Sequence, residues 1–490
     1  MAKGVTPKSE NFNRWYTDVI TKAQMADYGP VKGTMVIRPY GFAIWETIRN
    51  SFDKRFIETG HVNAYFPLFI PKSFLSKEAE HVEGFAKECA VVTHSRLKAA
   101  DDGKTVEIDS SSKLEEEIIV RPTSETIIWS MYQKWINSYR DLPILINQWA
   151  NVVRWEMRTR LFIRTSEFLW QEGHTAHATE EEALEETYKM LEIYKEVVEN
   201  VMAIPVLTGK KSESEKFAGA IETLCIEAMM GDKKALQAGT SHYLGQNFAK
   251  AFDVKFQTEE NTEQFVYATS WGVSTRLIGA LIMVHGDEKG LRLPPKVATN
   301  QVIILPIAKK NMNMEPIKTY IKPILKNLKK LNIRFYVDDR EKVSPGYKFN
   351  EWEMKGAPIR LEVGARDMEN SQVFVVRRDT GEKQAFDIEN VGNKIADLLD
   401  EIQENMYNQA LAFREKNSYN VTNWQDFKSK IELGGFVKCG WDGTKESENK
   451  IKNETKATIR CIPFDEKPEK LKCVYSGSPA KHEAVFAKSY

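Results

Sequence analysis

One stretch of the sequence gathers charged side chains at a spacing that suits the binding of an anion. NVVRWEMRTRLFIRTSEFLWQ, at 151–171, contains two strand-like runs joined by a charged turn. A turn within MRTRL would place Arg154 opposite Arg164, and the period of two along a strand would put Glu156 and Trp170 on the same face. Guanidinium groups match phosphate oxygens two at a time, so this face suits a polyphosphate. The alternative is a solvated hairpin with ion pairs, and a register shift of one residue would separate the set.

Two other stretches run from a strand into a helix and carry charge at that junction. RPTSETIIW at 121–129 would deliver Thr123 and Glu125 to a helix entrance, where a carboxylate can hold an ammonium group. The alternative is a plain N-cap with an acid in the first turn. YATSWGVSTRLIGALIMV places Arg276 in the first turn of its helix, where the guanidinium, the dipole and the free amides would converge on one anion. The alternative for Arg276 is an ordinary surface residue.

The elements that must position these residues are strands and helices of an α+β domain. PILINQWANVVRW and EQFVYATSW are rich in β-branched and aromatic residues, as strands are. Thr179 and Glu182 form a capping box ahead of an acidic helix with a buried apolar stripe. This alternation predicts an α+β catalytic domain around an antiparallel sheet, and the polar segment 95–117 is expected to be a surface loop.

A second, smaller α/β domain is predicted after the prolines at 294 and 295. Its apolar runs alternate with helical segments, and a long polar helix is expected from about 387 to 415. We expect three domains: 1–296, 297–405 and a small α+β C-terminal domain at 406–490. The expected strands of the second domain are VIILPI at 302–307, IRFYVD at 333–338, IRLEVG at 359–364 and QVFVVRR at 372–378.

The composition is that of an ordinary globular protein of several domains. The 490 residues include 69 Lys plus Arg and 69 Asp plus Glu, so the chain has no net charge that would attract it to nucleic acid or anionic lipid. An anionic partner must therefore bind to local patches of basic residues. The longest apolar run near the middle of the chain, LIGALIMV, is far too short to cross a membrane. No secretory signal is visible at the N-terminus and the five cysteines do not resemble a disulfide framework, so we expect a cytoplasmic protein with reduced thiols.

Taken together, the motifs resemble one family over nearly the whole chain. The strings TSE, RWE followed by RTRLFIRTSEFLWQEGHTAHAT, QAGTSHYLGQNFAK, SWGVSTRLIGALIMVHGD and PGYKFNEWEMKGAPIRLEVGARD resemble class II prolyl-tRNA synthetases of the archaeal and eukaryotic type. The resemblance implies that L-proline is activated by ATP with Mg²⁺ to prolyl-adenylate and then transferred to tRNA(Pro). Adenylation requires a carboxylate and an α-phosphate to be held together against their repulsion, and guanidinium groups do this.

The resemblance also assigns expected roles. Arg154 and Arg276 are the expected catalytic residues, with Arg154 on the α-phosphate and the proline carboxylate. A histidine satisfied within the core is the alternative for His174 and for His242. The expected proline-binding residues are Thr123, Glu125, Arg154, Trp170, His174 and His242, and the expected ATP-binding residues are Arg154, Glu156, Arg164, Gln237, Thr240 and Arg276.

For tRNA, the resemblance assigns the second domain to the anticodon. Base reading is expected from Lys355, Arg360, Glu362 and Arg366, whose side chains can hydrogen-bond to splayed bases. The segment from Lys309 to Arg334 holds eight basic residues against one acid, Glu315, and either contacts the tRNA backbone or is a solvated face.

Further expectations from the resemblance concern the oligomeric state, the editing insertion, the zinc site and the C-terminal residue. A homodimer is implied by RPYGFAIWETIRNSF, which resembles the first class II motif, and the short distance from Glu172 to Glu263 leaves no room for a bacterial editing insertion. Only Cys439 and Cys473 remain of the four cysteines that hold zinc in relatives, since Thr444 and Tyr475 stand at the other two positions; no structural zinc is expected. The carboxylate of the last residue, Tyr490, is expected on the active-site side, with a frayed terminus as the alternative.

Two rival functions remain open from the sequence. One is a synthetase for another small amino acid, which an apolar pocket would discriminate from proline only incompletely. The other is a non-catalytic RNA-binding protein built on the same fold, which has no physical need for the guanidinium cluster.

Overall fold

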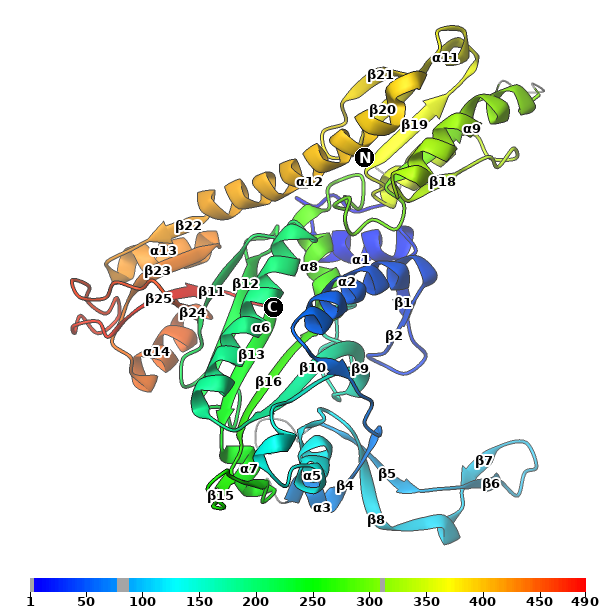
Figure 1. The fold of residues 1–490 in the computed structure, drawn as a ribbon. Helices are drawn as coiled ribbons and strands as arrows, with labels where there is room; N and C mark the ends of the chain where they lie inside the picture. The colour runs from blue at the N-terminus through cyan, green and yellow to red at the C-terminus, as the bar shows by residue number, and fades with distance from the viewer. Residues whose placement is uncertain (1–3, 77–87, 309–312) are drawn as a thin grey trace.

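The computed structural model describes residues 4–76, 88–308 and 313–490 (Figure 1). Its largest feature is an 11-stranded sheet in the order β22-β23-β25-β24-β11-β12-β13-β16-β10-β9-β3. Neighbouring strands are antiparallel except for the pairs β3–β9 and β22–β23. The strands are β3 (Val62–Asn63), β9 (Ile144–Val153), β10 (Glu167–His177), β11 (Val206–Lys210), β12 (Glu222–Met229), β13 (Ala235–Gly245), β16 (Tyr267–Ser274), β22 (Ser418–Asn420), β23 (Phe436–Trp441), β24 (Thr458–Pro463) and β25 (His482–Ala487).

Helices cover one face of the central strands. They are α1 (Phe12–Lys22), α2 (Pro39–Glu58), α6 (Glu180–Asn200) and α8 (Arg276–His285). Thr179 caps α6 by accepting from the Glu182 amide, as the capping box predicts. On β16, Trp271 and Val273 point into this core, and the Trp271 ring lies 4.9 Å from that of Phe56 on α2. The alternate residues of β16 therefore point to the opposite face of the sheet, away from these helices.

The apolar face of α2 packs within the chain. Ile44, Ile48, Phe52 and Phe56 are buried in the core, so this face of α2 is not an exposed surface. The remaining elements of the first 300 residues lie around the sheet. They are β1 (Ala26–Tyr28), β2 (Met35–Ile37), β4 (Phe69–Pro71), α3 (Lys72–Ser76), β5 (Ala90–His94), β6 (Leu97–Ala99), β7 (Val106–Ile108), β8 (Lys113–Val120), α5 (Glu125–Trp135), α7 (Asn247–Ala251), β14 (Lys255–Gln257) and β15 (Glu263–Phe265), with 3-10 turns at Ser110–Ser112 and Tyr139–Asp141.

The segment 95–117 is a hairpin rather than the surface loop that its polarity predicted. Strands β6 and β7 pair with each other and project from the molecule, and β8 begins at Lys113 (Figure 1). The hairpin was not expected because the polar runs DDGK and SSSK dominate the segment, whereas its strands are only three residues long and keep Leu97, Val106 and Ile108 exposed.

The second domain is the predicted α/β unit. Its sheet has the order β18-β17-β19-β20-β21, with β17 parallel to β18 and β19. Its core is separate from that of the large sheet. The elements are β17 (Val302–Pro306), α9 (Glu315–Lys330), β18 (Phe335–Val337), α10 (Pro345–Met354), β19 (Ile359–Val363), α11 (Ala365–Glu369), β20 (Gln372–Arg377) and β21 (Lys383–Asp387), followed by a 3-10 turn at Ile388–Asn390 and the long helix α12 (Val391–Lys416).

Helix α12 crosses the molecule to a C-terminal unit that extends the large sheet (Figure 1). This unit adds α13 (Trp424–Leu433) and α14 (Lys445–Thr455) to strands β22 to β25. Its strand β24 pairs with β11, Gly209 opposite Pro463. A Cβ at Gly209 would lie 2.3 Å from the Ile462 carbonyl oxygen, so this close approach requires glycine. Across the described residues, no helix has both the length and the apolar character needed to cross a membrane.

Candidate active site

The face of the large sheet that the helices leave uncovered forms a cavity of about 410 Å³. Two rows of side chains cross three neighbouring strands there, because directly opposed residues of antiparallel strands share a face. In one row Glu172 on β10 lies opposite Gly272 on β16, which lies opposite Thr240 on β13. In the next row the order is His174, Ser270 and His242. Residues far apart in the sequence are therefore brought to one surface by strand register alone.

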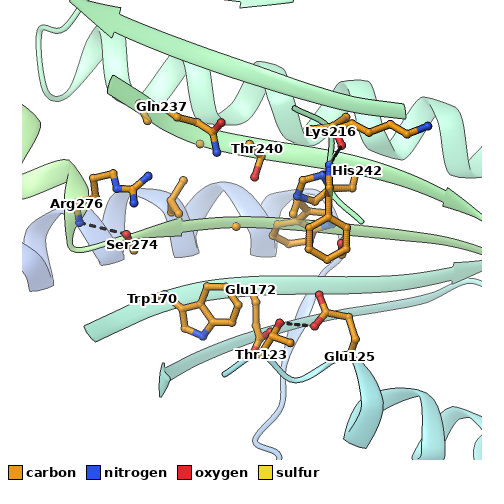
Figure 2. Close-up of a pocket in the computed structure, with 18 of the residues that line it drawn as sticks. Thr123, Glu125, Trp170, Glu172, Lys216, Gln237, Thr240, His242, Ser274 and Arg276 are labelled. Atoms are coloured by element: carbon orange, nitrogen blue, oxygen red, sulfur yellow. Dashed lines mark hydrogen bonds between the residues drawn. The ribbon is translucent and has the colours of Figure 1, made fainter. Parts of the chain in front are cut away.

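A bulge on β13 adds Gln237 to this surface. Ile226 pairs with Gly239 and Glu227 pairs with Gln237, so Ala238 is the extra residue. An extra residue reverses the alternation of side chains, which lets Gln237 and Thr240 point to the same side although they are three residues apart. Figure 2 shows Gln237 and Thr240 pointing into the cavity from β13. Arg276 lies at one end of the cavity, and Thr123, Glu125 and His242 lie towards the other.

The carboxylate end of the cavity is built where β8 runs into α5. Thr123 donates to the Glu125 carboxylate, and Glu125 is the first residue of α5. Ser124 is the N-cap, but its side chain makes no capping bond to the helix; its hydroxyl donates to Glu172 instead. Both glutamates are buried, at 5% and 2% exposure. A buried carboxylate facing a cavity favours a cationic ligand group.

Glu172 was not among the predicted site residues, yet it organises this end. It accepts hydrogen bonds from Ser124, from Gln148 at 2.8 Å and from His174 Nε2 at 3.0 Å. Burial alone would raise the pKa of Glu172, but the bond from His174 and its charge lower it. Burial opposes protonation of His174, but the bond to Glu172 and the charge of Glu125 outweigh it and raise the pKa of His174. The period of two between Trp170 and His174 was the signal that could have found Glu172.

His242 is held neutral on the other side of the cavity. Its Nδ1 lies 3.0 Å from the Thr223 hydroxyl, and its ring stacks on Phe217 with centroids 4.5 Å apart. Burial, with a smaller contribution from the charge of His174, lowers the pKa of His242 to about 3. The imidazole is therefore a wall of the cavity and not a cation. Phe217 belongs to a loop between β11 and β12 that sequence patterns did not single out.

Arg154 lies just after β9 rather than within a hairpin strand. The last pair of the β9–β10 ladder is Val153 with Glu167, and the amide of Arg154 donates to Ser166. The predicted pairing of Arg154 with Arg164 is thus wrong, since Arg164 instead bridges Arg160 within a longer turn. That turn contains a positive φ of 61° at Phe162, which period-two reasoning cannot anticipate.

The guanidinium of Arg154 is nevertheless fixed at the cavity. Its Nε donates to the Pro122 carbonyl oxygen at 3.0 Å, and its Cζ lies 5.5 Å from the ring centres of both Phe168 and Trp170. Cation–π contacts of this kind hold the plane of a guanidinium. The predicted grouping of Arg154 with Trp170 is therefore present, reached through ring stacking and not through strand pairing.

Arg276 begins α8, and like charges surround it. Burial, with the charges of Arg154 and Arg164, lowers the pKa of Arg276 to about 10. Its Nε donates to the Ile163 carbonyl oxygen at 3.2 Å, which aims the group from the helix start. A cluster of guanidiniums that repel one another binds an anion strongly, because the anion relieves the repulsion.

The structure brings nine of the eleven predicted residues to the cavity wall. Glu156 and Arg164 are the two that do not line it, and they pair with each other at 3.5 Å in the adjacent turn. Arg164 is 53% exposed there, so it is accessible to a ligand that extends out of the cavity. The nine that line the cavity are Thr123, Glu125, Arg154, Trp170, His174, Gln237, Thr240, His242 and Arg276.

The four residues predicted to read bases are divided in the second domain. Arg360 and Glu362 pair at 2.8 Å on the half-buried face of β19, with the guanidinium 4.4 Å from the Phe349 ring centre. Lys355, at the end of α10, pairs with Glu351 at 2.8 Å and lies over Trp352. Arg366 is placed apart from them on α11.

The basic segment 309–334 is only partly a free surface. The lysines at 322, 326, 329 and 330 are exposed along α9, whereas Lys318 pairs with Asp339 at 3.3 Å. Arg334 is engaged by backbone carbonyls, including that of Ala298. Lys309 and Lys310 lie outside the described residues.

The C-terminal cysteines are buried free thiols. Cys439 and Cys473 are each 2% exposed, and burial is the main cause that raises the pKa of Cys439, followed by the proximity of Cys473. Thr444 caps α14 and Tyr475 donates to Glu454, so both are used structurally. Within residues 4–76, 88–308 and 313–490, no group of three or more His, Cys, Asp or Glu side chains has the arrangement of a metal site.

The C-terminal residue is docked on the large sheet. The Tyr490 hydroxyl donates to Asp232 at 2.6 Å, and its amide donates to the Ala235 carbonyl at the start of β13. The guanidinium of Arg160, from the turn that follows Arg154, lies 4.8 Å from the Tyr490 ring centre. The terminus is therefore not frayed, and it contacts the turn next to the cavity.

Comparisons with known proteins agree with this architecture. Residues 105–285 match the tRNA synthetase class II core domain (G, H, P, S and T), residues 301–398 match an anticodon binding domain, and residues 424–490 match the prolyl-tRNA synthetase C-terminal domain. The chain is 57% identical over 492 residues to the proline–tRNA ligase of Bacteroides fragilis, and 56% identical to those of Porphyromonas gingivalis (488 residues) and Cytophaga hutchinsonii (491 residues). These alignments cover 100% of this chain and 99%, 99% and 100% of the three relatives. With its class II core, its anticodon-binding domain and its full-length similarity to these enzymes, the chain belongs to the prolyl-tRNA synthetase family.

Proposed function

We propose that this protein joins L-proline to tRNA(Pro) in two steps, through a prolyl-adenylate formed from proline and ATP. The observation that carries the proposal is the polarity of the cavity: buried carboxylates stand at one end and a guanidinium cluster at the other. A zwitterionic amino acid and a polyphosphate fit this arrangement together, with the amino acid carboxylate facing the α-phosphate between the two ends.

At the carboxylate end, Glu125 is the proposed partner of the secondary ammonium of proline. Thr123, which already donates to Glu125, orients that carboxylate. The Trp170, His174 and His242 rings form the wall against the pyrrolidine methylenes. A neutral His242 suits this role because an imidazolium there would repel the ammonium.

At the guanidinium end, Arg154 is proposed to hold the proline carboxylate and the α-phosphate. Attack of a carboxylate oxygen on the α-phosphorus brings two anions together and develops negative charge on the phosphate oxygens. A guanidinium already fixed by Pro122 and two rings stabilises that charge without having to reorganise. Arg276 is proposed to orient the departing pyrophosphate, and Arg164 is proposed to reach it from the turn.

For the nucleoside, Gln237 and Thr240 on β13 are the proposed contacts inside the cavity. Glu156 is the proposed partner on the adenine side. Mg²⁺ would arrive with the phosphates of ATP as part of the substrate, where it neutralises their charge. Mg²⁺ keeps several waters and needs few protein ligands, so this proposal requires no dedicated cage of carboxylates.

For tRNA, the second domain is proposed to bind the anticodon. Arg360 lies over the half-buried Phe349 ring and pairs with Glu362, and Lys355 lies over Trp352, so these polar groups are proposed to hydrogen-bond the edges of an unstacked base. Arg366 is retained as a fourth, separate contact. The exposed lysines of α9 would meet backbone phosphates.

We retain the domain boundaries 1–296, 297–405 and 406–490 as a proposal, with α12 as the connection across the second boundary. The archaeal and eukaryotic type, without an editing insertion, also remains a proposal. It is supported by the residues between β10 and β15, all described, which form α6, β11 to β13, α7 and β14. A cytoplasmic location is supported by the five free cysteines.

A homodimer is proposed on the outer surface of residues 28–69. Large apolar side chains of this segment are 39–72% exposed, and their burial against a second copy of the chain is the proposed reason for that exposure. Light scattering of the purified protein would distinguish a dimer from a monomer. The side chains are Tyr28, Val31, Val36, Phe42, Ile57, Val62, Tyr65 and Phe69.

The test of the function is ATP–pyrophosphate exchange with each of the twenty amino acids, followed by charging of tRNA(Pro). Proline is expected to give the highest kcat/KM, with slower activation of alanine and cysteine because an apolar wall separates small side chains poorly. Threonine or glycine outpacing proline would favour a different synthetase. ATP turnover without charging of tRNA would favour a non-catalytic RNA-binding role.

A further inference from the structure

The loop between β11 and β12 supplies one wall of the cavity. Its residues Glu215, Lys216, Phe217 and Ala218 line the cavity, and Phe217 stacks on His242. Besides this stacking on β13, the loop contacts the catalytic domain through a hydrogen bond from the Phe217 amide to the Thr223 hydroxyl at 3.0 Å and through apolar packing of Phe217 and Ala220. We call residues 211–217 the wall loop.

Further anchors of the wall loop come from the C-terminal domain. The Ser212 hydroxyl donates to Glu448 Oε1 on α14 at 2.7 Å, and both residues are buried, at 2% and 4% exposure. One helical turn further along α14, Lys452 Nζ lies 3.2 Å from Glu215 Oε1. Helix α14 therefore contacts the wall loop at two points spaced by four residues on one helical face.

The start of the wall loop is fixed by a buried charge cluster that also crosses the domain boundary. Lys211 Nζ lies 2.7 Å from Glu227 Oε1 and donates to the Arg460 carbonyl oxygen at 2.7 Å. The Arg460 guanidinium on β24 donates to Glu227 at 3.0 and 3.1 Å. A charge cluster without exposure to water is costly unless every member is paired, so its geometry is narrowly defined.

From these contacts we propose that the C-terminal domain is a positioning element for the proline pocket: Glu448, Lys452 and Arg460 hold the wall loop so that Phe217 closes against His242. This inference rests on the proposed function, because it takes the cavity to be the site for proline. The three residues do not touch the reacting atoms; they act through Ser212, Glu215 and Lys211.

The energetic argument rests on the bond between Ser212 and Glu448. Burial raises the pKa of Glu448 despite the hydroxyls of Ser212 and Ser214, so the carboxylate depends on these donors for its solvation. Removing the carboxylate leaves the Ser212 hydroxyl buried without its acceptor, which favours displacement of the loop. A displaced loop moves Phe217 away from His242 and enlarges the pocket on the pyrrolidine side, but leaves Gln237 and Arg276 in place.

The first experiment compares Glu448→Ala with Glu448→Gln in ATP–pyrophosphate exchange. Glu448→Ala is expected to raise the KM for proline by about tenfold, the consequence of losing one hydrogen bond to a charged group. The KM for ATP and kcat should change by less than about twofold, since the loop does not contact the guanidinium end. Glu448→Gln keeps an oxygen acceptor for Ser212 and should restore the KM for proline. The matched control is Glu446→Ala, an exposed glutamate on the same helix, which should behave as wild type.

A second variant avoids the buried bond. Lys452 is 53% exposed, so Lys452→Glu should fold normally while placing a negative charge beside Glu215. It is expected to raise the KM for proline several-fold, and added salt should reduce this effect. The double variant Ser212→Ala with Glu448→Ala should be no worse than Glu448→Ala alone, because both remove the same bond.

The outcomes separate this inference from the proposed function. If the wild-type protein shows no proline-dependent exchange, the function itself is wrong. If the wild type is active and both Glu448→Ala and Lys452→Glu keep its KM for proline, the positioning role is wrong. Equal losses in kcat and in both KM values, together with a lower melting temperature, would also overturn it, because they would show a general structural role.

Discussion

Replacement of Glu125 by glutamine tests the polarity of the cavity with the smallest possible change. The amide has the shape of the carboxylate, and its oxygen still accepts from Thr123, so the start of α5 should be preserved. What is lost is a buried negative charge opposite the proposed ammonium of proline. A hydrogen bond to a charged group contributes about 1.5–3 kcal/mol. The expected loss in kcat/KM for proline is therefore about 10- to 150-fold.

The same variant has an electrostatic signature away from proline. The charge of Glu125 is one cause of the raised pKa of His174, so this pKa should fall in the variant. Any limb of the pH profile that depends on His174 should move to lower pH. Exchange measured from pH 5 to 9, with proline and ATP varied separately, records both effects. The control is Glu115→Gln, an exposed glutamate on β8. An equal rise in the KM for ATP and for proline, or a change below about threefold, would refute the assignment of Glu125 to the ammonium.

Four further outcomes are expected. Arg276→Ala should reduce ATP–pyrophosphate exchange by about 100-fold or more, mainly at limiting ATP, because it removes a preorganised cation. The control Arg14→Ala, at an exposed arginine, should leave exchange unchanged. A normal KM for ATP in Arg276→Ala would contradict the proposed role of Arg276. Because the pKa of His242 is lowered to about 3 in the folded state, the unfolded chain binds a proton at this histidine more tightly. The contribution of His242 to the free energy of unfolding is therefore present above pH 6.5 and is lost as the pH falls from 6.5 towards 3. Thermal unfolding over this pH range should show a smaller loss of stability for His242→Gln than for wild type. Lys355→Ala should raise the KM for tRNA(Pro) in charging several-fold and spare exchange, and equal loss in both assays would count against an anticodon contact. Treatment with a zinc chelator, followed by excess Mg²⁺, should leave the melting temperature unchanged; a large decrease would reveal a structural metal.

The arrangement of secondary structure followed from the sequence wherever periodicity was clear. Strands β17 to β20 and the helices between them alternate as their apolar runs predict, and α6 begins after the capping residue Thr179. The hairpin at 95–117 was missed because each of its strands β6 and β7 is only three residues long, too short for the alternation of Val106, Glu107 and Ile108 to stand out among polar neighbours. The turn after Arg154 was missed for a different reason. Its path depends on tertiary contacts, such as the bond from the Ser166 amide to the Gly33 carbonyl, and these have no local signature.

Most side chains of the candidate site were predictable from the sequence, but Glu172, Phe217 and the way the site is assembled were not. Residue types and motifs pointed to nine side chains that line one cavity. The register that aligns them could not be read from the sequence, because the bulge at Ala238 shifts Gln237 onto the face of Thr240 without any unusual residue. The wall loop was not predicted because Phe217 is the one aromatic residue of a short segment without apolar periodicity, KSESEKFAGA, and only the fold brings it to His242.

The geometry of the large sheet explains how one chain with no net charge keeps opposite charges at the two ends of its cavity. The two kinds of charge lie on different elements. The buried carboxylates Glu172 and Glu125 are on β10 and α5, and the guanidiniums of Arg154 and Arg276 are at the end of β9 and the start of α8. Because opposite residues of neighbouring strands share a face, a shift of one residue between β10 and β16 would remove Glu172 and His174 from the cavity together. The interior face, where Trp271 packs against Phe56, makes such a shift costly. The hydrophobic core on one side of the sheet therefore maintains the separation of charge on the other side.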